Sequence, residues 1–289
     1  MIPQDVPVSD AERAALRQCV LAVAVLHDVD LEPDDAGVRL SSGRLVPWET
    51  LSLALRPVDP SAPAARARLA RWLVALRMIS WRSPDDLAER ARPVGLPVGH
   101  TLHPGLSWVR EPVRGGAVHL GLGFVGVGAD PEGVHVLPAG VVEVAAGDAG
   151  LLSEWWSRAR GYVEEMGALA AQRYLRRPDG PLRPMGDADV VTLLASEELR
   201  SVLAAGRAQG LRAAAVPTRR RGWLDLSRTD PAFALCAASL AEPDDRGFPR
   251  PLLITREEVT MAREGGDPVL QALREQAAPD PIVSPMGWA

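Results

Sequence analysis

Apolar residues recur every three or four positions in three stretches of the chain, which is the spacing of one face of an α-helix. The first stretch runs from about residue 10 to 27 and follows Ser9 and Glu12, which have the spacing of a capping box. The second runs from about 62 to 80. The third, over 151–176, is the strongest, and its inward stripe is expected to consist of Leu152, Trp155, Ala159, Tyr162, Met166 and Leu169 or Ala170.

Turn and cap residues predict shorter elements. Residues 41–43, with sequence Ser-Ser-Gly, indicate a short hairpin, and Pro47 starts a brief helix. Ser83, followed by Pro84 and two acidic residues, predicts the start of another helix. Residues 92–108 are rich in Pro and Gly, so they predict a linker or a domain boundary.

Residues 109–146 are poor in charge and have the composition of β-structure. Within them, GLGFVG at 121–126 has the spacing G-x-G-x-x-G of a dinucleotide-binding loop. That loop needs a helix directly after it, whereas 130–133 has turn chemistry and a β-like run follows. Alternation along 118–127 instead predicts a hairpin strand with an apolar face and a glycine face. We expect the helix that begins at Leu151 to pack on the glycine face; a ligand lying there is the alternative.

The C-terminal third is expected to begin with a strand, a helix and a strand, over 190–196, 197–210 and 211–217. That order favours a parallel, right-handed crossover, with antiparallel pairing left open. A further strand is expected at 251–255. Thr255 and Glu258 have the spacing of a capping box and predict a helix over 256–264.

Together these elements predict an α+β protein. Residues 1–108 form its helix-rich N-terminal part. Residues 109–289 form a central Gly-rich β-hairpin followed by an α/β-like C-terminal part. The two parts are expected either as separate domains or as one continuous domain.

Composition narrows the classes of function. The chain has 289 residues and a formal net charge of −5, and all 32 of its basic residues are Arg because the sequence contains no Lys. It contains no Asn either. Both amino acids have codons beginning with AA, so we expect a source with a GC-rich genome, a high-GC bacterium. Without Lys, the standard forms of P-loops, protein kinases and Schiff-base enzymes are excluded.

No metal, cofactor or membrane segment is expected. Cys19 and Cys236 are too far apart for a C-x-x-C site, and His100 and His103 are interpreted as ordinary histidines despite their H-x-x-H spacing. The apolar run at 19–26 is too short to span a membrane. The first residues lack the pattern of a signal peptide, so we expect a cytoplasmic location.

The candidate site is the Arg-rich stretch 217–230, which follows an expected strand. Arg guanidinium groups suit phosphate or carboxylate, and Trp stacks on a base or anchors an interface. The alternative, which is the commoner case for charge runs, is a solvated Arg run around a buried Trp, with Ser227 or Thr229 capping the next helix. The candidate residues are Arg219, Arg220, Arg221, Trp223, Asp225, Arg228 and Asp230. A second basic edge is expected from Arg173, Arg176, Arg177 and Arg183.

Standard catalytic motifs are missing from the sequence, and we assign no catalytic residue. Trp is favoured at protein interfaces, and the chain has eight. We therefore expect a non-enzymatic cytoplasmic binding or scaffold protein that acts through a protein partner or self-association. The alternative is an enzyme or sensor that binds a phosphorylated or carboxylated small molecule at loop 217–230. Nucleic-acid binding ranks lower, because it requires the two Arg clusters to lie on one face.

Overall fold

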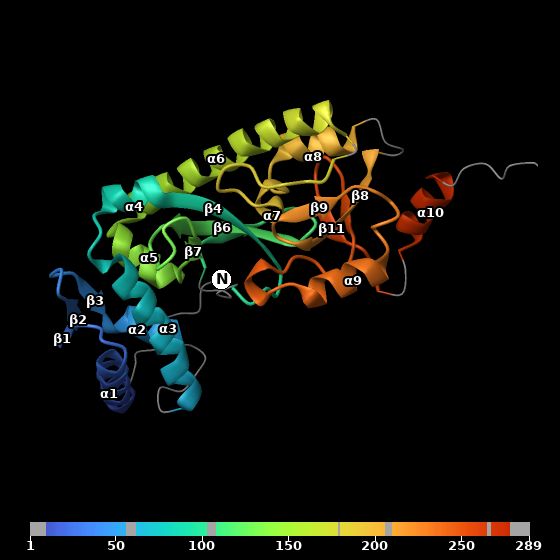
Figure 1. Ribbon diagram of the computed structural model, residues 1–289. Coiled ribbons are helices and arrows are strands. Elements are labelled where there is room, and N and C mark those ends of the chain that lie inside the picture. The colour runs from blue at the N-terminus through green and yellow to red at the C-terminus, as the bar shows by residue number, and fades with distance from the viewer. Residues whose placement is uncertain are drawn as a thin grey trace, which may run out of the picture. The chain divides into compact units, whose positions relative to one another are not determined.

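The computed structural model describes residues 10–55, 62–102, 108–178, 180–205, 210–264 and 267–277. These residues form helices and three antiparallel sheets, which confirms the α+β class (Figure 1). The chain divides into two compact units, each assembled from separate stretches. Unit 1 comprises Met1–Pro93, His103–Arg110 and Gly121–Gly161, and unit 2 comprises Val94–Leu102, Glu111–Leu120 and Tyr162–Ala289. The division at residue 108 stays a prediction.

The N-terminal stretch of unit 1 has the helices and the hairpin that the pattern predicts. Its elements are α1 (Asp10–Leu26), β1 (Leu31–Pro33), β2 (Gly37–Leu40), β3 (Leu45–Pro47), α2 (Trp48–Leu55), α3 (Pro63–Ser80) and α4 (Pro84–Arg90). The three strands form an antiparallel sheet in the order β1-β2-β3. The Oγ atom of Ser83 accepts a hydrogen bond from the backbone N–H of Asp86 at 3.1 Å, so the helix cap predicted there is formed.

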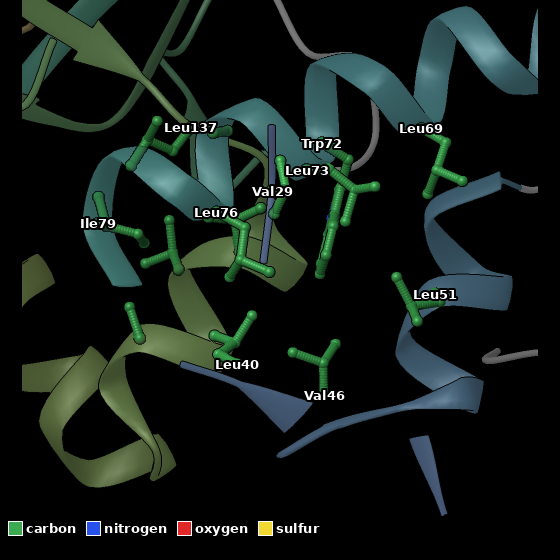
Figure 2. Packing of buried hydrophobic residues seen from close by; sticks show 14 of the residues in the cluster. Val29, Leu40, Val46, Leu51, Leu69, Trp72, Leu73, Leu76, Ile79 and Leu137 are labelled. Atoms are coloured by element: carbon green, nitrogen blue, oxygen red, sulfur yellow. The ribbon is translucent and has the colours of Figure 1, made fainter. Parts of the chain in front are cut away.

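The core of unit 1 gathers around α3, as Figure 2 shows. Leu69, Leu73 and Ile79 lie on the buried side of this helix and have no exposed surface. Complete burial of an aliphatic side chain of this size stabilises a fold by about 1.5–3 kcal/mol. Other segments of the same unit contribute further buried side chains to the cluster: Val29, Leu40, Val46, Leu51 and Leu137.

Strand β6 (Val118–Val125) carries the Gly-rich motif and pairs antiparallel with β7 (Val134–Val136), so the predicted hairpin is confirmed. The expected packing of a helix on the glycine face is wrong at Gly121. The indole ring of Trp108 covers this glycine and fills the space that a Cβ atom at residue 121 would need. Trp108 Nε1 donates a hydrogen bond to the carbonyl oxygen of Leu122 at 2.8 Å. Trp155 instead meets Phe124 edge-on, with ring centroids 5.7 Å apart.

The return half of the hairpin is shorter than expected, because the chain turns into helix α5 (Ala139–Ala146). Pro138 stands at its N-cap, and Gly147 ends it in the left-handed conformation, with φ of 78°. Helix α6 (Ala149–Arg176) follows and is the long helix that the apolar stripe predicts (Figure 1).

The Pro- and Gly-rich stretch expected to be a linker or a domain boundary contains a strand, and two breaks between the units, after Pro93 and after Leu102, fall within the stretch. Strand β4 (Ala91–Pro97) belongs to a sheet with the order β4-β6-β5, where β5 is Arg110–Pro112. The backbone of Gly95 lies against the backbone of Thr192, and Gly95 N–H donates to Thr192 Oγ1 at 2.8 Å. This glycine therefore permits close approach of two chain segments rather than flexibility.

The C-terminal part of the chain is antiparallel, so the favoured parallel crossover is wrong. Strand β8 pairs antiparallel with both β10 and β9, in a sheet with the order β11-β10-β8-β9. Its strands and the helices around it are β8 (Arg212–Thr218), β9 (Arg221–Trp223), β10 (Leu252–Ile254), β11 (Val259–Met261), α8 (Glu197–Ala204), α9 (Pro231–Leu240), η3 (Pro243–Asp245) and α10 (Pro268–Ala277).

The strand expected at 190–196 is a helix, α7 (Val190–Leu193). Asp189 caps it, since its Oδ1 atom accepts a hydrogen bond from Thr192 N–H at 2.7 Å. All four residues of α7 are buried. A run that is buried on every side has no polar period to distinguish a helix from a strand, and this is why the pattern misled.

The helix expected over 256–264 is also wrong. Thr255 Oγ1 accepts hydrogen bonds from the backbone N–H groups of Glu257 and Glu258, at 3.2 and 3.1 Å, and Thr255 N–H donates to the Glu258 carbonyl at 3.0 Å. These bonds close the turn between β10 and β11. A Thr side chain can hydrogen-bond nearby backbone in a turn as well as at a helix start, so the capping pattern fits both structures.

Candidate functional site

The Arg-rich stretch folds as the β8–β9 hairpin, with Arg219 and Arg220 at its turn. The Arg219 side chain forms an ion pair and a hydrogen bond within the protein. Its Nη2 atom lies 2.6 Å from Asp189 Oδ2, and the two side chains are only 16% and 15% exposed. Its Nη1 atom donates to the carbonyl oxygen of Asp244 at 3.2 Å. Arg219 thus anchors the hairpin turn to the start of α7 and to η3.

The two acidic candidates also support the backbone. Asp225 Oδ1 accepts a hydrogen bond from Ser227 N–H at 2.9 Å, and this bond is the main reason why the pKa of Asp225 is lowered. Asp230 caps α9, with its Oδ1 atom accepting from Ala232 N–H at 2.7 Å. Asp230 therefore takes the capping role that was expected of Ser227 or Thr229.

The structure brings together Arg221, Trp223 and Arg228. The guanidinium carbons of the two arginines lie 6.0 and 5.7 Å from the centroid of the Trp223 ring, within the range of cation–π attraction. Phe233 meets the same indole edge-on, with centroids 5.7 Å apart. Arg220 stands apart, with its Nε atom 3.4 Å from Asp245 Oδ1 in an exposed ion pair.

The second basic edge lines a groove of about 630 Å³ within unit 2. The last turns of α6 form one wall, the loop 180–185 forms another, and residues of α7 and α8 complete it. Arg173, Arg176, Arg177 and Arg183 all contribute to its lining, which contains no carboxylate among the described residues. The apolar part of the lining is formed by Leu169, Ala170, Leu182, Met185, Val190, Leu193 and Leu199.

Most of these guanidinium groups have no partner among the residues that the structure describes. Arg173 Nη1 donates to the carbonyl oxygen of Pro184 at 3.4 Å. The side chains of Arg176, Arg177 and Arg183 form no hydrogen bond or ion pair with any residue of the described ranges, and all three are exposed. Cations at the C-terminal end of a helix are favoured by its dipole, which accounts for Arg173 and Arg176 but not for Arg183.

The loop that carries Arg183 is held at both ends. Leu182 N–H donates to the Gly222 carbonyl at 2.7 Å, and Gly222 N–H donates back to Leu182 at 3.1 Å. Asp187 N–H donates to the Tyr162 hydroxyl at 2.9 Å. Gly186 has φ of 55° and lies so close to Tyr162 that a Cβ atom would not fit. These contacts order the loop, which therefore forms a defined wall of the groove.

The bond between Leu182 and Gly222 also joins the two basic clusters. Arg183 follows Leu182 in the sequence and Arg221 precedes Gly222, so this isolated antiparallel bridge brings the segments that carry the two arginines side by side. The sequence indicated each Arg cluster separately. Their junction depends on a single backbone pairing between residues 40 positions apart, and no local pattern predicts such a contact.

His100 and Asp245 lie close enough to Arg219 for its charge to affect their pKa values. Burial lowers the pKa of His100, and the nearby Arg219 guanidinium lowers it further. Burial raises the pKa of Asp245. Opposite shifts of this kind occur at catalytic sites and in structural networks alike. Here the Arg219 N–H donates to the Asp245 carbonyl at 2.8 Å, so this contact secures the turn. His103 lies outside the described residues.

In the part of the chain that the structure describes, no three His, Cys, Asp or Glu residues are grouped to hold a metal ion, and no helix has the length and apolar character needed to cross a membrane. Comparisons with protein-family models, with curated proteins and with solved structures found no match to this chain. The function proposed below therefore rests on the geometry of the groove.

Proposed function

We propose that this chain is a binding protein that receives the carboxylate or phosphate group of a ligand in the groove at the C-terminal end of α6. The proposal rests on one observation. Four Arg side chains line a groove of about 630 Å³, and none of the described residues of that lining carries a carboxylate. Unneutralised like charges repel one another, and an anionic ligand removes that repulsion while it gains charge-assisted hydrogen bonds.

The groove favours binding over chemistry. Among the described residues of its lining, the ionisable side chains are four guanidinium groups and the phenol of Tyr174. Guanidinium stays protonated at any physiological pH, so these groups attract and orient an anion but do not exchange protons with it. The apolar lining residues Leu182, Val190, Leu193 and Leu199 are buried and supply a floor for an apolar part of the ligand.

The sequence raised two interpretations: a non-enzymatic binding or scaffold protein that acts through protein contacts, and an enzyme or sensor that binds an anionic small molecule at loop 217–230. The proposal retains a binding function and moves the anion site from that loop to the groove at the C-terminal end of α6. The cytoplasmic location remains part of the proposal.

Substitution of Arg176 and Arg177 by Gln tests the proposal. Binding of inorganic phosphate, citrate, adenosine monophosphate and decanoate is measured by isothermal titration calorimetry at low and moderate salt. We expect at least one of these anions to bind, and the double variant to weaken that binding by about tenfold, which corresponds to about 1.4 kcal/mol. The affinity of the unmodified chain should fall as salt rises.

The matched control is the double variant Arg39→Gln and Arg158→Gln. It removes the same charge from two exposed ion pairs, with Asp34 and Glu154, that lie outside the groove lining. Equal binding in the control and the unmodified chain is expected. If none of the four anions binds, or if the two double variants lose affinity equally, the groove is not an anion site.

A further inference from the structure

The basic surface does not end at the groove. Leu182 lines the groove, and its backbone pairs with Gly222, the residue between Arg221 and Trp223. The set of Arg side chains without an ion pair in the described ranges therefore continues from Arg176 through Arg183 to the β8–β9 hairpin. A ligand that fills the groove alone leaves the hairpin end of this set unused.

The junction itself is unfavourable without a partner. Like charges on neighbouring chain segments repel each other when no opposite charge lies between them. Arg183 and Arg221 are each next in sequence to a member of the Leu182–Gly222 pair, and both side chains are exposed. Arg221 and Arg228 form no ion pair with a described residue, although Arg228 lies close enough to Asp225 to help lower the pKa of that carboxyl. A carboxylate placed between Arg183 and Arg221 would relieve their repulsion.

The hairpin is poorly suited to nucleic acid. Proteins that bind single strands offer exposed aromatic faces on which bases stack. The ring of Trp223 is contacted by the guanidinium groups of Arg221 and Arg228 and by the ring of Phe233. Tyr174 in the groove lining is buried, with 9% of its surface exposed. The buried apolar floor of the groove matches an aliphatic or aromatic side chain, which a sugar–phosphate backbone lacks.

We infer that the partner is an acidic polypeptide segment carrying apolar side chains. One apolar side chain enters the groove, and carboxylates follow across Arg183 and Arg221 to Arg228. This inference rests on the proposed anion-binding function and extends it from a single anionic group to a protein partner. Recognition of an acidic motif by an Arg cluster is an established mode of peptide binding.

Three fluorescently labelled probes of equal length test the inference by anisotropy: a peptide of alternating Glu and Leu, an all-Glu peptide and oligo-deoxythymidine. We expect the Glu–Leu peptide to bind most tightly. The double variant Arg221→Gln and Arg228→Gln should weaken that peptide by about tenfold and leave binding of the small anion in the groove within about twofold, since neither residue lines the groove and a guanidinium beyond a ligand's reach contributes little. The charge-matched control remains Arg39→Gln with Arg158→Gln.

The outcomes separate the inference from the proposed function. If small anions bind but the Glu–Leu peptide binds no more tightly than they do, the extended partner is wrong and the groove proposal stands. Tighter binding of oligo-deoxythymidine than of either peptide also overturns the inference, in favour of nucleic acid. If neither small anions nor peptides bind, both proposals fail. Normal circular dichroism of the Arg221→Gln, Arg228→Gln variant excludes misfolding as the cause of a loss.

Discussion

Arg200 shows what an arginine does in this chain when it belongs to the fold. It is 7% exposed, and its Nη1 atom donates to the carbonyl oxygens of Leu194 and Ala195 at 2.8 and 2.7 Å. Burial lowers its pKa, and Glu164 and Glu197 oppose that shift. Arg176 and Arg177 differ from Arg200 because their side chains make no such hydrogen bonds with described residues. The sequence predicts the charge of every arginine, but only the contacts show which guanidinium groups support the fold and which can bind a ligand.

At the residue scale, His100 makes stability depend on pH. Its pKa is lowered from 6.5 in the folded chain, so the folded state holds fewer protons on His100 than the unfolded state in slightly acidic solution. Neutral His100 therefore contributes stability that is fully present above pH 6.5. This contribution is lost as the pH falls through the pKa of His100 in the folded state. We therefore expect the thermal midpoint to fall on acidification, and His100→Gln to remove part of that fall. Differential scanning calorimetry at several pH values measures it.

His27→Gln is the control for this substitution, because His27 is exposed. Its thermal midpoint should follow that of the unmodified chain at every pH. An identical pH dependence for His100→Gln and the unmodified chain would show that His100 does not titrate in the way described.

At the scale of elements, two glycines of α6 occupy opposite environments. A Cβ atom added at Gly161 meets nothing within 4 Å, whereas one added at Gly167 would meet the hydroxyl group of Ser196. Ser196 Oγ donates to Glu164 Oε2 at 2.8 Å and caps α8. One glycine only weakens the helix, and the other allows α6 and α8 to approach closely.

Substitution of each glycine by Ala should therefore change stability in opposite directions. Gly161→Ala should raise the free energy of unfolding by about 0.5–1 kcal/mol, because Ala is the better helix former. Gly167→Ala should lower it by about 1–3 kcal/mol through overpacking. Urea denaturation of both variants measures the difference. Stabilisation by both substitutions would mean that α6 and α8 are not in close contact.

The elements also show how far the sequence predicts this fold and site. Helices α1, α3 and α6 were predictable because each buries one face and leaves the other in water, which leaves a period in the sequence. Helix α7 was not, because it is buried all round, and β11 was not, because a Thr-x-x-Glu turn resembles a helix cap. The groove was predicted only as a set of Arg residues, since its apolar floor combines residues of the loop 180–185, α7 and α8 that lie apart in the sequence.

At the scale of the whole molecule, the two units share elements. Helix α6 passes from unit 1 to unit 2 between Gly161 and Tyr162, and β4 and β6 each change units within the strand. Three regular elements therefore run across the breaks between the units. Melting one unit would therefore interrupt regular structure that belongs to the other.

We accordingly expect one cooperative unfolding transition for the whole chain. Calorimetry should give a single heat-absorption peak whose calorimetric and van't Hoff enthalpies agree. Circular dichroism of the helices and tryptophan fluorescence should follow the same curve. Two resolved peaks, or two probes with different midpoints, would instead identify the units as separate domains.

The loop that carries Arg183 has a further consequence for the thermodynamics of binding. Its backbone is already ordered by the Leu182–Gly222 pairing and by the bond from Asp187 N–H to the Tyr162 hydroxyl. Ordering a flexible segment on binding costs conformational entropy, about 1–2 kcal/mol for each residue's backbone. Folding of the free chain has already met this backbone cost. The affinity of a ligand for this wall therefore reflects the contacts that the ligand makes, without a further cost for ordering the loop backbone.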